Sequence, residues 1–180
     1  MITLLLFAVT SAAVATSDVP PCVPVASDDL APTSSAIEDH KALRKALGEP
    51  MPTAQTMVMV FGRGGHLSNG EYSVILAQDA NNVWNGTAVG RGRISVKDAP
   101  FVPMKRIEWV LDKERSEKLE DAISRRCQID RSVALNREFG PPPLGYISER
   151  IDIILPGQST LTYYASEGDD KIASLIRPPE

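Results

Sequence analysis

The 180-residue chain has few of the residue types on which proteins commonly build a metal centre or a stacking surface. It contains 2 Cys and 2 His, and aromatic residues make up 6% of it. Histidines and cysteines so far apart match no zinc-binding spacing, and so few aromatic residues offer no obvious platform for stacking bases or sugars. We therefore expect no metal ion and no cofactor.

The chain also lacks a strong charge of one sign, since 19 Lys and Arg against 23 Asp and Glu give a net charge of −4 at pH 7. Proteins that neutralise phosphates usually carry a basic domain or stripe. This balance argues against nucleic acid and against an anionic membrane surface as partners. We expect an unidentified protein or a small anionic ligand instead.

Recognised catalytic motifs are missing as well. The chain holds no Gly-x-Ser-x-Gly, Ser-x-x-Lys or His-Glu-x-x-His sequence, each of which would place a nucleophile or a metal at a defined position. We therefore favour a protein without catalytic activity of its own. A small enzyme stays an alternative, because catalytic triads are assembled by geometry rather than by sequence spacing.

The first residues resemble an export signal. An apolar run over 2–9 is followed by Ala13 and Ala15, the small residues that precede a cleavage site. Because the run is shorter than the ~20 residues that span a bilayer, we predict a signal peptide over 1–15 and export to the periplasm or the cell exterior, without stable membrane insertion after processing. No Lys or Arg precedes the run, so the alternative is a cytoplasmic chain whose residues 1–15 belong to the core.

The next segment, 16–33, contains four of the 14 prolines and is predicted to be a disordered tether. Residues 34–177 then form a single domain, as expected for a chain of this length. Two cysteines in an exported protein suggest one disulfide, between Cys22 and Cys127, which would join the tether to a helix. Two unpaired thiols are the alternative.

Hydrophobic periodicity and turn residues predict an ordinary mixed fold. A capping box at Ser35–Glu38 opens the first helix, Asp112 caps the second, and Pro156-Gly157 forms a type II turn. The predicted helices cover 35–47, 113–127 and 169–177, and the predicted strands cover 56–61, 72–77, 83–89, 105–111, 151–155 and 160–164. We predict the α+β class, with an antiparallel sheet of about five or six strands and two or three helices packed on one face.

One glycine-rich stretch, 61–70, is the best candidate for a ligand site. Backbone N–H groups around Gly64 and Gly65 can converge on an anion, and the side chains of Arg63 and His66 can complete such a site. Arg91 and Arg93 follow a later strand whose end should lie at the same end of the sheet, so they are predicted to join the anion site. The alternative is a wide turn between two strands, with Asn69-Gly70 at its tip.

His40 lies among the apolar positions of the first helix, and we interpret it as a packing residue, with no carboxylate partner that the sequence can assign. The sequence thus favours an exported small globular protein that acts as a binding or assembly-supporting module. The alternative is a small anion-binding receptor or a hydrolase-like enzyme that uses the Arg63–His66 loop.

Overall fold

The structure is a computed structural model that describes residues 23–25, 33–65, 68–128, 147–164 and 171–179. Its elements in chain order are β1 (Val23–Val25), α1 (Thr33–Ala46), β2 (Met57–Gly64), β3 (Ser68–Gln78), β4 (Trp84–Ile94), β5 (Val102–Pro103), β6 (Ile107–Val110), α2 (Lys113–Ser124), β7 (Arg126–Gln128), β8 (Ile147–Ile154), β9 (Leu161–Tyr164) and α3 (Lys171–Ile176).

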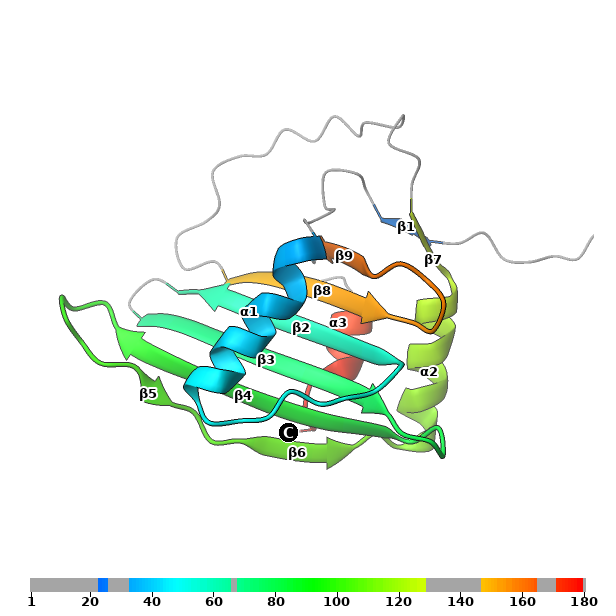
Figure 1. Ribbon diagram of the computed structural model, residues 1–180, viewed down its shortest axis with the longest axis horizontal. Coiled ribbons are helices and arrows are strands. Elements are labelled where there is room, and N and C mark those ends of the chain that lie inside the picture. The colour runs from blue at the N-terminus through cyan, green and yellow to red at the C-terminus, as the bar shows by residue number, and fades with distance from the viewer. Residues whose placement is uncertain (1–22, 26–32, 66–67, 129–146, 165–170, 180) are drawn as a thin grey trace, which may run out of the picture.

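The main sheet is antiparallel, and its strands follow the order β5-β4-β3-β2-β8-β9, while β6 also pairs with β4 (Figure 1). Three successive strands, β2, β3 and β4, form a meander, because short connections between adjacent strands favour antiparallel pairing. The late strand β8 pairs with β2 and so returns to the middle of the sheet. This return places residues 83 to 97 positions apart in the sequence opposite one another on neighbouring strands.

Alternating side chains divide the sheet into two faces. Val58 and Val60 of β2 and Val74 and Leu76 of β3 pack with Leu119 of α2 in the larger hydrophobic core. The residues of α3 belong to the same core, so α2 and α3 lie on this side, which we call the α3 face. Burying apolar strand residues beneath helices is the main stabilising contribution that this layered arrangement offers.

The opposite side of the sheet is crossed by α1, and we call it the α1 face (Figure 1). Here Met57, Met59 and Ile75 are buried and pack with Ile37 of α1 and with Met51. The central strand β2 is therefore covered on both sides. This agrees with its almost uninterrupted apolar sequence, which predicted a strand in the middle of a sheet.

The predicted α+β class is confirmed, and each of the six predicted strands is present. The seventh strand of the main sheet, β5, is only two residues long and includes Pro103, so it leaves no periodic pattern to recognise. Two helices, α2 and α3, share one face as predicted. The third, α1, lies on the other face, because its buried side chains find their partners on the polar side of β3 and β8.

Several local signals at the ends of elements agree with the structure, but the predicted capping box at Ser35–Glu38 lies inside α1, which begins at Thr33. The Asp112 side chain accepts a hydrogen bond from the Arg115 backbone N–H at 2.8 Å, and so caps α2. Gly48 after α1 and Gly157 in the β8–β9 turn both have positive φ, 73° and 70°, which glycine adopts at little cost.

The predicted turn at Asn69-Gly70 is wrong, because both residues lie inside β3, opposite Arg93 and Gly92 of β4. Arg91–Arg93 likewise belongs to a strand rather than to the loop we predicted after one. Glycine and asparagine favour turns, but this local preference is weak. Here the long pairing of β3 with β4 overrides it.

The predicted signal peptide over 1–15, Cys22 and His66 lie outside the described residues. Within the segment predicted as a tether, β1 pairs in parallel with β7, and Pro24 lies opposite Cys127. The disulfide between Cys22 and Cys127 stays a prediction. No helix in the part of the chain that the structure describes is long and apolar enough to cross a membrane.

Candidate functional site

The structure brings two of the predicted anion-binding arginines together, but around an internal carboxylate. Glu71 of β3 lies opposite Arg63 of β2 and Arg91 of β4 in the strand register. Its Oε2 is 3.1 Å from Nη2 of Arg63, and its Oε1 is 2.5 Å from Nη2 of Arg91. Glu71 therefore already neutralises part of the charge that was predicted to attract an external anion.

The structure also describes three other residues of that prediction. Arg93 lies against Phe101 together with Arg91, and their guanidinium carbons are 4.7 and 4.5 Å from the ring centroid. Gly64 and Gly65 have φ values of 150° and 125°, at the end of β2 and just after it. Since His66 lies outside the described residues, its contribution to an anion site stays a prediction.

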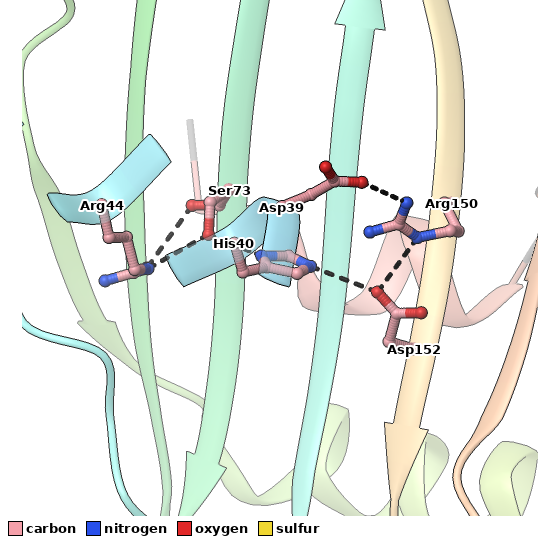
Figure 2. A network of polar contacts seen from close by, with 6 residues as sticks. All are labelled: Asp39, His40, Arg44, Ser73, Arg150 and Asp152. Atoms are coloured by element: carbon pink, nitrogen blue, oxygen red, sulfur yellow. Dashed lines mark hydrogen bonds and ion pairs between the residues drawn. The ribbon is translucent and has the colours of Figure 1, made fainter. Parts of the chain in front are cut away.

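A second polar group is buried between α1 and the sheet (Figure 2). His40, Ser73 and Asp152 are each 0% exposed, and they come from α1, β3 and β8. The His40 ring is 2.7 Å from Ser73 Oγ through Nδ1 and 3.3 Å from Asp152 Oδ2 through Nε2. His40 is thus a buried residue, as the sequence suggested, but with a carboxylate partner that the sequence did not assign.

Hydrogen-bond chemistry fixes the proton positions in this group. An ionised carboxylate only accepts, so Nε2 of His40 carries the hydrogen that faces Asp152. Burial lowers the pKa of His40 despite the opposing effect of Asp152, so the ring is neutral at neutral pH. With its one hydrogen on Nε2, the ring accepts at Nδ1 from the Ser73 hydroxyl, whose oxygen in turn accepts from the Nε–H group of Arg44 at 3.1 Å.

Two arginines complete the buried group. Arg44, which is 1% exposed, also donates to the Thr87 carbonyl at 3.1 Å and to Thr87 Oγ1 at 2.9 Å. Arg150 donates to Asp152 at 3.3 Å and to Asp39 of α1 at 2.7 Å (Figure 2). Buried polar groups are tolerated when they are hydrogen-bonded, and these bonds fix how α1 sits on the sheet.

A third feature is a pocket of about 440 Å³ on the α3 face, at the end of the sheet opposite α2. It is built from side chains of β3, β4, β6 and β8, from the segment before β6, and from the residues after α3. Its apolar lining consists of Val74, Ala88, Val89, Met104, Ile107, Ile147 and Pro178. Concave, mainly apolar pockets of this size are the usual form of a small-molecule site.

A small polar group stands at one side of this pocket. The Tyr72 hydroxyl donates to Oε1 of Glu149, and Nη2 of Arg177 donates to both carboxylate oxygens of Glu149, at 3.1 and 3.3 Å. Burial and the neighbouring Glu149 carboxylate both raise the pKa of the Tyr72 phenol, so Tyr72 stays protonated at neutral pH. Lys105 adds a second positive charge to the lining.

Glycines on both neighbouring strands make room for Tyr72. It pairs with Gly62 of β2 and with Gly90 of β4. A Cβ atom added at Gly62 would overlap the Tyr72 ring, and one at Gly90 would lie 3.0 Å from the Glu71 carbonyl oxygen. Gly62 therefore allows the tyrosine ring to lie across β2 and to reach Glu149, which is the partner of Gly62 on β8.

We expect Gly62→Ala to lower the free energy of unfolding by about 1–3 kcal/mol, because the added methyl group forces the Tyr72 ring out of its position. Urea unfolding measures this change. Gly70→Ala is the matched control, since the nearest atom to its added methyl would be Met104 Cε at 3.8 Å, and we expect its effect to stay within about 0.5 kcal/mol. Equal losses in both variants would contradict the proposed packing.

No sequence pattern singles out Tyr72, Glu149 or Arg177. A signal was present in Gly62 and Gly90, but glycines near a predicted turn are more simply explained by the turn itself. Only the strand register shows that both face one aromatic residue.

Comparisons of the chain with protein-family models, with curated proteins and with solved structures give no match. Among the described residues, no three His, Cys, Asp or Glu side chains are grouped as metal ligands would be. The function has to be argued from the site itself.

Proposed function

We propose that this protein is a non-catalytic binding module, exported in its mature form, and that the pocket on the α3 face holds a small molecule. The observation that carries the proposal is the pocket of about 440 Å³ with apolar walls and one polar group, formed by Tyr72, Glu149 and Arg177. Binding sites for small molecules combine these properties: apolar walls supply affinity, and a few polar groups set orientation.

The buried histidine group does not favour a hydrolase instead. Ser73, His40 and Asp152 are the residue types of a catalytic triad, but all three are 0% exposed beneath α1. A triad must present its serine oxygen to a substrate carbonyl. The Ser73 oxygen is instead buried and accepts a hydrogen bond from Arg44, so it does not face a substrate. This group supports a structural role.

Blocking the pocket tests the proposal. Ile107 lines the pocket, whereas Val110 of the same short strand is 61% exposed and alternates to the other face. With the uncharged fluorophore N-phenyl-1-naphthylamine as the probe, we expect saturable binding to the wild-type chain. Ile107→Trp should weaken it by at least about tenfold, or 1.4 kcal/mol, because the larger side chain fills the pocket. Val110→Trp, the matched control, should bind as the wild type does.

Two results would overturn the proposal. Binding that is absent, or that is equally strong in the Ile107→Trp and Val110→Trp variants, would show that the pocket is not the site. Turnover of ester, amide or phosphate substrates that is lost in Ser73→Ala or in His66→Ala would show an enzyme instead.

A further inference from the structure

The charged side chains around the pocket on the α3 face differ in sign and in exposure to solvent. Its lining holds two cations, Lys105 and Arg177, and one anion, Glu149. The Arg177 side chain is 64% exposed and that of Glu149 only 18% exposed. A ligand at the mouth of the pocket would therefore meet more positive than negative charge.

The carboxylate of Glu149 is already engaged. It accepts from the Tyr72 hydroxyl and from Nη2 of Arg177. A cationic head group would have to displace Arg177 and would stand close to Lys105. An anionic head group does not have to displace Glu149 from Arg177. The guanidinium group has five N–H donors, and its bonds to Glu149 use only those on Nη2, so other donors can bind the ligand.

The rest of the pocket is suited to an alkyl chain. Met104, Ile107 and Ile147 line it and are 52%, 43% and 45% exposed, which leaves apolar surface for a ligand to cover. Val74 of β3, which is 7% exposed, and Ala88 of β4 line the pocket as well. Each methylene group buried against such walls raises affinity by about fourfold.

We infer that the ligand is an amphipathic monocarboxylate, with its carboxylate at Arg177 and Lys105 and its alkyl chain along Ile107, Met104 and Val74. This inference rests on the proposed binding function and specifies its ligand class. The head group supplies selectivity by charge, and the chain supplies most of the affinity.

The test compares four probes on the full chain at neutral pH: decanoate, decanol, decylamine and acetate, each below its aggregation threshold and measured by displacement of N-phenyl-1-naphthylamine. We expect decanoate to bind about tenfold more tightly than decanol, decylamine to bind more weakly than decanol, and acetate not to compete. Lys105→Glu should weaken decanoate about tenfold and leave decanol unchanged. Lys113→Glu makes the same charge change on α2, outside the pocket lining, and should alter neither.

The outcomes separate the ligand class from the binding function. Equal affinity for decanoate and decanol, or tighter binding of decylamine, would overturn the carboxylate assignment while leaving the pocket as a binding site. Competition by acetate would show a simple anion site and would also overturn the assignment. Failure of every probe would overturn both proposals. Self-association of the chain, detected by sedimentation and abolished by Ile107→Trp, would also overturn both proposals, because a second copy of the chain would then cover the pocket.

Discussion

Replacing Asp152 by alanine is expected to lower the free energy of unfolding by about 3 kcal/mol at neutral pH. The carboxylate accepts hydrogen bonds from His40 and Arg150 at 3.3 Å each, and Asp152 is 0% exposed. Its removal leaves the His40 N–H group buried without this acceptor and takes from Arg150 one of the carboxylates that the described residues place beside it. Removing one partner of a buried charged pair costs about 3–5 kcal/mol, and the lower end applies because Arg150 keeps Asp39.

Asp121→Ala provides the matched control for this experiment. Asp121 also pairs with an arginine, Arg125 at 2.7 Å, but both side chains are about half exposed on α2. Exposed pairs contribute about 0–1 kcal/mol, so this variant should unfold close to the wild-type urea concentration. If Asp152→Ala lost no more stability than Asp121→Ala, the buried group would not hold α1 on the sheet as we describe.

Stability should also fall as the pH decreases below about 6.5, and His40 is the cause. In the unfolded chain His40 has its ordinary pKa of 6.5, whereas burial lowers this pKa in the folded protein. Between the two values the unfolded chain binds a proton that the folded protein does not. The free energy of unfolding therefore decreases by up to about 1.4 kcal/mol for each unit by which the pH falls below 6.5. Well above pH 6.5 His40 is neutral in both states, so its titration adds no pH dependence there.

Urea unfolding at intervals between pH 5 and 8 measures this slope. His40→Gln keeps a hydrogen-bonding side chain but does not titrate, so the slope below pH 6.5 should largely disappear. The chain has one other histidine, and His66→Gln removes that second titration as the control. A slope that persists in His40→Gln and disappears in His66→Gln would show that His40 is not the group responsible.

Both predictions concern a group that the sequence could not assemble. His40 and Asp152 are 112 positions apart, and β8 reaches the middle of the sheet only because it pairs with β2. Sequence patterns report local periodicity, and they are silent on which distant strands become neighbours. Arg150 and Asp152 alternate with Ile151 and Ile153 in β8, so their side chains share one face of the sheet. Nothing local in the sequence indicates that this polar face is buried.

The pocket was beyond sequence reasoning for the same reason. Tyr72, Glu149 and Arg177 belong to three separate parts of the chain, and each by itself is an ordinary residue of a strand or a chain end. The glycine-rich stretch could be interpreted only from its local sequence. In the structure Gly62 allows the close approach of the Tyr72 ring, and the Glu71 carboxylate lies between Arg63 and Arg91.

The sequence by itself determined the α+β class, the six principal strands, the Asp112 cap and the β8–β9 turn. These features depend on periodicity and on backbone preferences that act within a few residues. Only the tertiary structure decided the face that α1 covers, the partner of His40 and the pocket beside Tyr72. Each of these depends on contacts between distant segments, which the packing of the whole sheet selects.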